Sequence, residues 1–378
     1  MQKLWLITTC VLLLVSCKPR QESPLIPNIS NQETVVSYSK GFDINYYEGY
    51  KTITVNNPWP GADEHYTYAL IEKGTEIPLN KNFDAVIEIP ISSIVVTSTT
   101  HIPSLEMLDV QQSLVGFPGL NYISSEGTRN LISKGMIQEL GKNEEINTEL
   151  LLELSPDVVI TFAVDGSSKT LTTLQKTGIP VVYNADWTET SPLGKAEWIK
   201  FFAAFFNKES VANQIFNTIE KEYLEAKTIA SKAKDSPTVL SGAMYRDVWY
   251  MPQGNSWAAQ FIADANGEYL WKDSKGTGSL ALNLETVLEK GKHADFWIGP
   301  GQFTSLKHLK DMNTVYPEFD AYKRSKIFSF TTVKGETGGV LYYELAPNRP
   351  DIVLKDIIKI LHPELVSEHT LFFFSQLK

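Results

Sequence analysis

The chain has almost no cysteine, since Cys10 and Cys17 are the only two in 378 residues and both lie near the N-terminus. A disulfide framework and a thiol catalyst are therefore excluded for the rest of the chain. The six histidines include no pair four residues apart, and no Cys-x-x-Cys pattern accompanies them. Because zinc and related ions are usually held by such patterns, the sequence predicts no metal site.

Catalytic motifs are missing as well. The sequence contains neither a Gly-x-Ser-x-Gly elbow nor a P-loop. Residues 276–281 fit the dinucleotide pattern Gly-x-Gly-x-x-Ala, but the polar residues 272–275 precede them where a buried strand is required. The sequence therefore gives no specific support to an enzyme, and no cofactor is expected.

Basic clusters and long apolar runs are absent after the first 17 residues. The whole chain carries 34 lysines and arginines against 44 acidic residues, a formal net charge of −10. Without a basic patch, the chain is not expected to bind nucleic acid. No later stretch stays apolar over the roughly 20 residues that a membrane-spanning helix needs.

What the N-terminus does contain is a secretory signal. Lys3 precedes an apolar run over residues 4–15, and Ser16 and Cys17 follow it. The ending Leu-Val-Ser-Cys resembles the lipobox of bacterial lipoproteins, so we expect a signal peptide over residues 1–16, a lipidated Cys17 and a polar tether up to residue 34. The protein would then be lipid-anchored in the periplasm or on the outer face of a bacterial membrane. A simple signal with an incidental cysteine, or an uncleaved anchor, is the alternative.

The remaining chain of roughly 345 residues is too long for one compact core and predicts two lobes. Alternating patterns predict strands over residues 42–47, 51–55 and 66–71, as an extra N-terminal β ribbon on the first lobe. From about residue 85, short apolar runs alternate with helical patterns, which is typical of a parallel sheet covered by helices on both faces. The strands expected here are 91–96, 113–115, 158–161 and 181–183, and the helices are 102–108, 128–134, 148–154 and 169–177.

A long amphipathic helical block follows over residues 191–234, with a break expected at Asn207. Beyond it the alternation of strands and helices restarts. The predicted fold class is therefore α/β, with an N-terminal lobe at 35–190 and a C-terminal lobe at 235–378 joined by this long block. The second lobe is expected to contain strands at 238–243, 296–298 and 327–329 and helices at 256–263, 284–290 and 350–361.

Aromatic residues follow the predicted strands in both lobes. Ligands of open parallel sheets bind at the carboxyl ends of the strands, where rigid rings can line a cleft. Each ring has the alternative of belonging to the local core. Trp187 and Trp249 are expected to be the main ligand platforms, while Arg246 and Lys334 would attract an acidic ligand. The candidate ligand-binding residues are Phe117, Tyr122, Phe162 and Trp187 in the first lobe and Tyr245, Arg246, Trp249, Lys334, Tyr342 and Tyr343 in the second.

Two stretches of the chain repeat one pattern. Residues 147–160 read Asn-Thr-Glu-Leu-Leu-Leu-Glu-Leu-Ser-Pro-Asp-Val-Val-Ile, and residues 282–298 repeat the arrangement with Ala294-Asp295 in place of Pro-Asp. This pattern resembles the signature of class III ABC-transporter substrate-binding proteins, the family that binds ferric siderophores, haem and cobalamin. Residues 251–257 and 349–364 resemble further segments of that family. The resemblance covers the chain from about residue 85 to 365, so the N-terminal strands lie outside it.

The resemblance implies a binding protein with a rigid central helix, which delivers its ligand to an ABC permease and its ATPase. It also implies one permease-docking carboxylate in each lobe, at Glu149 and Glu285. Among the family's ligands we expect a corrinoid rather than a ferric siderophore, because cationic groups are few. A haem ligand stays open through His101 and the adjacent Tyr342 and Tyr343. An exported enzyme or a sensory binding domain on the same fold is the alternative.

Overall fold

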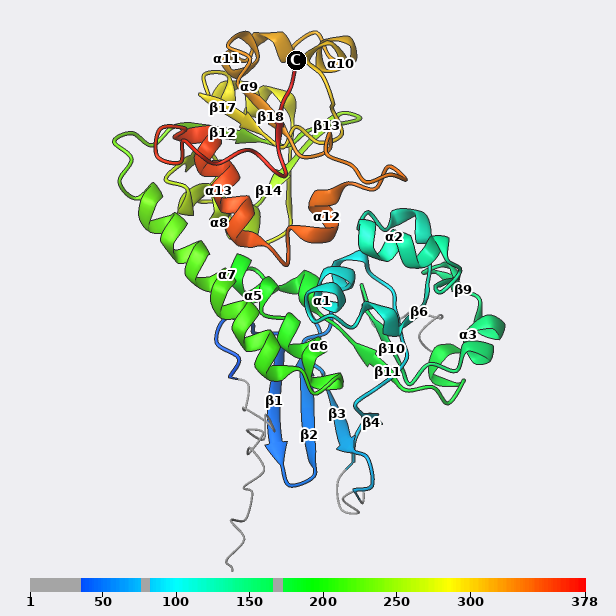
Figure 1. The fold of residues 1–378 in the computed structure, drawn as a ribbon. Helices are drawn as coiled ribbons and strands as arrows, with labels where there is room; N and C mark the ends of the chain where they lie inside the picture. Colours follow the sequence, from blue (N-terminus) through cyan, green and yellow to red (C-terminus); the bar gives the residue numbers. More distant parts are fainter. Residues whose placement is uncertain (1–34, 76–81, 166–172) are drawn as a thin grey trace, which may run out of the picture.

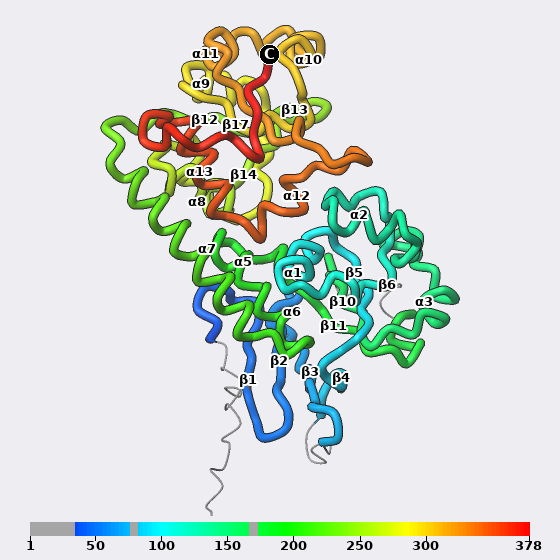
Figure 2. Tube along the Cα trace, viewed as in Figure 1, coloured from blue at the N-terminus to red at the C-terminus, as the bar shows by residue number. Residues whose placement is uncertain are grey.

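A computed structural model describes residues 35–75, 82–165 and 173–378. The predicted signal peptide, Cys17, the tether and the start of the helix predicted over 169–177 lie outside these ranges. Two lobes lie one above the other in Figure 1, and a separate small sheet projects below the lower lobe. The long helix α7 (Glu209–Ala230) runs along one side of both lobes, as Figures 1 and 2 show.

The first lobe is built on a five-stranded sheet in the order β11-β10-β5-β6-β7, in which all neighbouring strands are parallel. Strand β10 is buried along its whole length, as expected for a strand covered on both faces. The strands are β5 (Ile94–Val96), β6 (Leu114–Phe117), β7 (Gln138–Glu139), β10 (Val158–Thr161) and β11 (Val181–Tyr183), and β8 (Gly141–Lys142) pairs with β9 (Glu145–Ile146). The helices are η1 (Thr99–His101), α1 (Ile102–Met107), η2 (Gln111–Ser113), η3 (Leu120–Tyr122), α2 (Glu126–Ser133), α3 (Thr148–Leu154) and η4 (Asp186–Thr188).

The N-terminal strands form a four-stranded sheet of their own. Three strands were expected, and a fourth pairs in parallel with the third. Side chains of this sheet, including Phe42 and Ile53, pack into the same hydrophobic core as the first lobe. A buried ion pair between Lys51 and Glu209 fixes the sheet to α7. The strands are β1 (Phe42–Tyr47), β2 (Tyr50–Asn56), β3 (His65–Glu72) and β4 (Ala85–Ile89).

The linking block consists of α5 (Pro192–Ala196), α6 (Ile199–Phe205) and α7. Asn207 lies between α6 and α7 with a φ of +54°, so the break predicted at this residue is confirmed. The apolar face of α7 is shared between the lobes. Ala212, Phe216 and Ile219 belong to the first hydrophobic core, and Tyr223, Ala226 and Ala230 belong to the second. One helix therefore contributes to both cores, which couples the two lobes.

The second lobe repeats the parallel sheet in the order β15-β12-β17-β18-β19, with β19 antiparallel to β18. Its strands are β12 (Thr238–Ser241), β15 (Glu268–Tyr269), β17 (Phe296–Ile298), β18 (Ile327–Ser329) and β19 (Ser375–Gln376). A separate antiparallel sheet contains β13 (Ala243–Tyr245), β14 (Val248–Pro252) and β16 (Ser279–Leu282). The helices are α8 (Trp257–Asp264), α9 (Leu284–Gly291), α10 (Leu306–Met312), η5 (Tyr316–Glu318), α11 (Asp320–Lys323), α12 (Leu341–Leu345) and α13 (Pro350–Leu361). The structure thus confirms an α/β fold with two parallel-sheet lobes.

The asparagines of the repeated motif cap equivalent helices. Asn147 Oδ1 accepts a hydrogen bond from the Leu150 backbone N–H at 3.1 Å, at the start of α3. Asn283 Oδ1 accepts one from the Thr286 N–H at 2.8 Å, at the start of α9. Side-chain caps of this kind satisfy backbone donors that have no partner within the helix. The sequence repeat therefore reflects a structural repeat.

The aspartates of the same motif tie neighbouring strands together. Asp157 Oδ2 accepts from the backbone N–H groups of Ser92 and Ser93 at 2.7 and 2.9 Å, just before β5. Burial opposes ionisation of Asp157, but these hydrogen bonds outweigh it and lower the pKa of the carboxyl. In the second lobe, Asp295 Oδ2 accepts from the Thr238 N–H at 3.0 Å, where β12 begins. Each aspartate thus joins the start of its own strand to the start of the next strand in the sheet.

Candidate functional site

A cavity of about 720 Å³ opens in the second lobe at the carboxyl ends of β12, β17 and β18. Ligands of open parallel sheets bind at this edge, and the volume is in the usual range for small-molecule sites. The wall is built by the loops after these strands, the β13–β14 hairpin and four helices. Its side chains include Met244, Tyr245, Tyr250, Met251, Trp257, Phe261, Gln302, Phe303, His308, Met312, Phe330, Tyr342, Tyr343 and Phe374.

Gly242 lets the β13–β14 hairpin fold back over the end of β12. Its φ is +77°, and a Cβ atom at this position would lie 1.9 Å from the carbonyl oxygen of Tyr250. Only glycine therefore fits here. The Trp297 Nε1–H donates to the Gly242 carbonyl at 2.8 Å and holds the turn against β17. The hairpin then carries Tyr245 and Tyr250 to the rim of the cavity.

Stacked aromatic rings form one wall of the cavity. The ring of Tyr342 on α12 stacks on Phe330 with 4.3 Å between the centroids, and it lies 5.8 Å from Trp257. Ser256 caps α8 by accepting from the Ala259 N–H at 3.2 Å, which places Trp257 in the first turn of that helix. Burial raises the pKa of the Tyr342 hydroxyl, so this residue is neutral at physiological pH. The wall is therefore broad, rigid and uncharged.

Formal charge is missing from the described residues that line the cavity, which include no aspartate, glutamate, lysine or arginine. His308 supplies an imidazole instead. One ammonium lies near the aromatic wall, because Lys195 Nζ is 5.2 Å from the Trp257 ring centre and donates to the backbone oxygens of Asp186 and Trp187. Burial lowers the pKa of Lys195, and nearby carboxylates partly offset this effect. The lining suits apolar and neutral polar groups and offers little to an anion.

A segment of the second lobe, residues 335–348, contacts the first lobe; we call it the clasp. Glu344 on α12 accepts hydrogen bonds from the backbone N–H groups of Ser124 at 2.6 Å and Ser125 at 2.9 Å, directly before α2. Burial raises the pKa of the Glu344 carboxyl to about 7, and the nearby Glu106 adds to this effect while the two N–H groups oppose it. A titratable carboxyl thus lies within the contact between the lobes.

Other hydrogen bonds reinforce the clasp. The Thr337 hydroxyl donates to the Asn121 carbonyl at 2.8 Å. Asn348 Nδ2 donates to the Thr100 carbonyl at 2.9 Å, and its Oδ1 accepts from the Ser104 hydroxyl at 2.8 Å. Polar groups of three separate first-lobe elements therefore bind one short segment of the second lobe.

His101 is buried and does not line the cavity. Its side chain is 0% exposed, and its ring lies 5.3 Å from Phe202. Within the described residues, neither ring nitrogen has a hydrogen-bond partner. Burial lowers the pKa of this imidazole against the attraction of Asp186, which keeps it neutral. A fully buried imidazole offers no open position to a haem iron, so the expectation that His101 could be an axial haem ligand is wrong.

Three of the candidate ligand-binding residues line the cavity, namely Tyr245, Tyr342 and Tyr343. Trp249 does not, since it is 0% exposed, stacks on Trp297 and donates its Nε1–H to the Ser241 carbonyl at 3.0 Å. Successive side chains of a strand point to opposite faces, so β14 turns Trp249 into the core and Tyr250 outward. The prediction that Trp249 is a ligand platform is wrong.

The first-lobe candidates lie away from this cavity. Phe117, at the end of β6, is buried in the first core, so the prediction that it binds ligand is wrong. Tyr122 is 73% exposed and Trp187 is 39% exposed, but neither lines the cavity. Phe162 follows β10 and is half-buried. The structure therefore does not bring the two predicted aromatic groups together around one space.

The two cationic candidates are exposed. Arg246 has a left-handed φ of +56° in the tight turn between β13 and β14, and its guanidinium lies 5.4 Å from the ring of Tyr245. Lys334, directly before the clasp, pairs with Val340 in a short β-bridge. Neither residue lines the cavity. Their charges therefore do not lie on its wall.

Sequence reasoning missed several residues of the wall. Phe330 directly follows β18, so the rule that identified Tyr245 could have identified it as well. Trp257 follows the Gly-Asn-Ser sequence that caps α8, which places it on the same edge of the sheet. His308 and Met312 lie four residues apart on α10, and no local signal indicates that this helix faces the cavity.

The two predicted docking carboxylates occupy equivalent positions. Glu149 lies in the first turn of α3 and Glu285 in the first turn of α9, and both side chains are exposed. Neither carboxylate forms an ion pair with another residue that the structure describes. Docking to a permease would need carboxylates at equivalent positions in the two lobes that are exposed and have no ion-pair partner within the protein.

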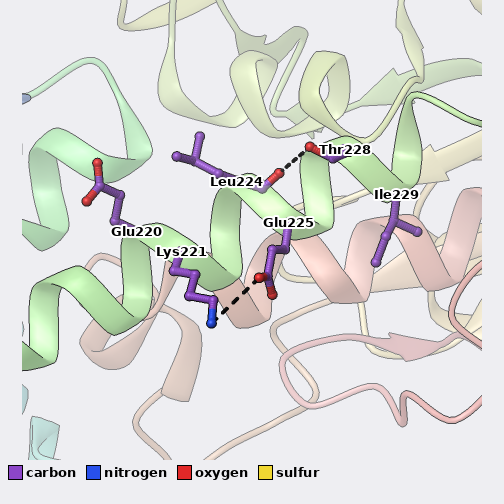
Figure 3. A pocket seen from close by; sticks show the side chains of 6 residues that line it. All are labelled: Glu220, Lys221, Leu224, Glu225, Thr228 and Ile229. Atoms are coloured by element: carbon purple, nitrogen blue, oxygen red, sulfur yellow. Dashed lines mark hydrogen bonds and ion pairs between the residues drawn. The ribbon is translucent and has the colours of Figure 1, made fainter.

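A second hollow, of about 670 Å³, lies along α7. Figure 3 shows that its six lining side chains all project from this one helix, and that Lys221 and Glu225 form an ion pair. Described residues of other elements do not supply a facing wall. Because a small-molecule site is concave on several sides, the second-lobe cavity is the better candidate.

Clusters of three or more histidine, cysteine, aspartate or glutamate side chains that could hold a metal ion are not found in the described ranges. None of the helices in these ranges combines the length and apolar character needed to cross a membrane.

The lobes, the shared helix and the cavity define a two-lobed solute-binding protein. A sequence model described as periplasmic binding protein matches residues 94–331, which is more than half of the chain. The chain therefore belongs to the periplasmic binding protein family, whose members bind ligands for ABC permeases. An uncharacterized lipoprotein of Methanocaldococcus jannaschii is 29% identical over 368 residues, covering 91% of this chain and 86% of the relative. A second lipoprotein of that organism is 25% identical and covers 88% of this chain and 83% of its own length.

Solved structures with the same fold are more distant in sequence. A possible iron-binding periplasmic protein of Staphylococcus epidermidis has a TM-score of 0.56 at 16% identity, covering 72% of this chain and 99% of its own. The triscatecholate siderophore binding protein of Bacillus subtilis has a TM-score of 0.55 at 19% identity, covering 78% and 100%. The vitamin B12 binding protein of Vibrio cholerae has a TM-score of 0.51 at 12% identity, covering 74% and 99%. These similarities confirm the predicted class III fold.

Proposed function

We propose that the protein captures a corrinoid such as cobalamin in the second-lobe cavity and delivers it to an ABC permease. The observation that carries this proposal is the lining, in which aromatic rings and methionines surround a space without formally charged side chains. Ferric catecholates are strongly anionic and favour sites with basic groups, and haem carries two carboxylates. A large neutral ligand fits such a wall better.

Calorimetric titration of the purified full-length protein tests this ligand class. Cyanocobalamin, haemin, a ferric catecholate and a ferric hydroxamate would be compared, and cyanocobalamin is expected to bind at micromolar concentration or more tightly. Replacing Tyr245 by alanine should weaken binding by about 1–3 kcal/mol, or roughly 5- to 150-fold. Tyr122→Ala is the matched control, because this exposed ring lies outside the cavity. Failure of cyanocobalamin to bind would contradict the proposal that the ligand is a corrinoid. An equal loss of affinity in Tyr122→Ala and Tyr245→Ala would contradict the proposal that the second-lobe cavity is the binding site.

We also propose that Cys17 carries a lipid, which holds the protein in the periplasm or on the outer face of the membrane. The sequence Leu-Val-Ser-Cys supports this proposal, as does the description of two relatives as lipoproteins. Cell fractionation of Cys17→Ala should shift the protein from the membrane to the soluble fraction. Cys10→Ala provides the control, since Cys10 lies within the apolar run of the signal and should not affect anchoring.

Docking to the permease is proposed to use Glu149 and Glu285. Two exposed carboxylates on separate lobes would fix the orientation of the binding protein, and charge pairs of this kind act on encounter and register as well as on affinity. Replacing both by lysine should abolish uptake into vesicles that contain the permease and leave ligand affinity unchanged. The matched control replaces Glu153 and Glu289, which are exposed on the same two helices. Normal uptake by the Glu149→Lys, Glu285→Lys protein would exclude the docking role.

A further inference from the structure

A smaller cavity, of about 420 Å³, lies between the N-terminal sheet and the first lobe. Tyr66 and Tyr68 of β3 and Asp84 before β4 contribute to one side, and Tyr183 of β11 contributes to the other. None of the described residues that line this cavity also lines the cavity of the second lobe. Strands β3 and β4 lie outside residues 94–331, so the side of this cavity that they build is not part of the matched family region.

Tyr183 contributes a hydroxyl group to the wall of this cavity. The residue is only 6% exposed, and its backbone N–H donates to the Tyr68 hydroxyl at 3.0 Å. Its own hydroxyl forms no hydrogen bond with any residue that the structure describes. Because the side chain lines the cavity, its hydroxyl can donate to or accept from a molecule that binds there.

The surroundings of this hydroxyl are aromatic and negatively charged. The ring of Tyr183 lies 4.6 Å from that of Tyr66 and 5.9 Å from that of Trp59. Burial raises the pKa of Tyr183, and the carboxylates of Glu64 and Asp84 raise it further, so this phenol is neutral at physiological pH. The described lining includes no lysine or arginine.

The Asp84 carboxylate, which lines this cavity, is held in place by the backbone. Asp84 Oδ2 accepts from the Thr67 N–H at 2.7 Å, and the Asp84 N–H donates back to the Thr67 carbonyl at 2.9 Å. A carboxylate has about four lone-pair positions, so Asp84 can still accept from a ligand. Glu64 Oε2 accepts from the Tyr66 hydroxyl at 2.9 Å and adds negative charge at the same edge.

We propose that this cavity binds a small organic cation that carries a primary ammonium group. The ammonium N–H groups donate to the Tyr183 hydroxyl oxygen and to the Asp84 carboxylate, and the methylene groups lie against the tyrosine rings. Aromatic rings attract cations through their negative faces, and nearby carboxylates strengthen this preference. The site is independent of the ligand and the permease proposed above, because it shares no described lining residue with the second-lobe cavity.

Titration of the full-length protein with 1,4-diaminobutane tests the inference, with 1,4-butanediol as a neutral ligand of the same length. The diamine should bind saturably at millimolar concentration or below, and the diol should not bind. Asp84→Asn should weaken diamine binding about 5- to 20-fold, and Tyr183→Phe, which removes only the hydroxyl, should weaken it about 3- to 10-fold. Asp63→Asn is the control, because this exposed acid does not line the cavity.

Three results would overturn the proposal. These are the absence of saturable diamine binding, equal affinity for the diol, and equal weakening by Asp63→Asn and Asp84→Asn. Tyr245→Ala, a variant of the other cavity, should leave diamine binding unchanged. A failure of cyanocobalamin to bind would leave the diamine result intact, so the two proposals can fail separately.

Discussion

Replacing Glu344 by glutamine removes a titratable charge from the contact between the lobes. The two carboxyl oxygens accept from the Ser124 and Ser125 N–H groups, and glutamine retains the size and one acceptor oxygen. Burial, with a contribution from the carboxylate of Glu106, raises the pKa of Glu344 from 4.5 to about 7. Glu106 itself accepts from the Thr128 N–H at 3.1 Å.

The sign of the effect follows from this raised pKa. The folded protein holds the proton more tightly than the unfolded chain does, so the stabilisation is complete below about pH 4.5 and is lost as the pH rises through about 7. Over the interval from pH 5 to pH 8, this carboxyl alone should remove on the order of 2 kcal/mol from the free energy of unfolding. Glutamine does not titrate, so the variant should lack this loss.

Urea unfolding of the two proteins at pH 5 and pH 8 measures the difference. At pH 5 the wild type should be at least as stable as Glu344→Gln, because its carboxyl is largely protonated. By pH 8 the variant should gain about 2 kcal/mol relative to the wild type. Glu336→Gln, an exposed change in the same clasp, should show no such gain. A difference between Glu344→Gln and the wild type that stays constant with pH would refute the reasoning.

Three further predictions concern the core and the coupling of the lobes. Trp249→Ala should lower the free energy of unfolding by about 3–5 kcal/mol in urea titrations, because the ring is fully buried; weaker ligand binding with unchanged stability would contradict its place in the core. Glu209→Ala removes the carboxylate partner of the buried Lys51 ammonium, which also donates to Asn207 Oδ1, and should cost about 3–5 kcal/mol. Lys51→Met with Glu209→Leu should recover most of this loss. Ligand should change the radius of gyration little in solution scattering, since α7 belongs to both cores, and a large closure would exclude this coupling.

The parallel strands could be predicted closely from the sequence. Strands β10, β11, β17 and β18 begin and end where their short apolar runs do. Such runs are the signal of strands buried on both faces. The strand predicted over 238–243 is instead divided at Gly242, because its left-handed φ turns the chain into the β13–β14 hairpin. That turn depends on a close approach to Tyr250, which no local pattern reveals.

The site could be predicted only in part. The rule that ligands bind at the carboxyl ends of parallel strands identified Tyr245, Tyr342 and Tyr343. This rule does not say which face of β14 packs against the core. Trp249 was therefore expected to line the cavity, whereas it lies in the core and Tyr250 lines the cavity. The clasp was beyond sequence reasoning, because Glu344 binds a backbone N–H of Ser124, 220 residues away. Contacts over such distances follow from the packing of the lobes and have no local signature.

The structural repeat separates a folding role of Glu149 and Glu285 from the docking role proposed for them. Asn147 and Asn283 already cap α3 and α9 through their side chains, so a glutamate two residues later is not needed for this purpose. Its remaining structural contribution is the attraction of a first-turn carboxylate to the helix dipole, worth about 0.3–1 kcal/mol at an exposed site. Glu149→Gln and Glu285→Gln should therefore change the free energy of unfolding by at most about 1 kcal/mol each. If either variant unfolded much more easily, the repetition of this glutamate would be explained by folding, and the case for a shared role at the permease would be lost.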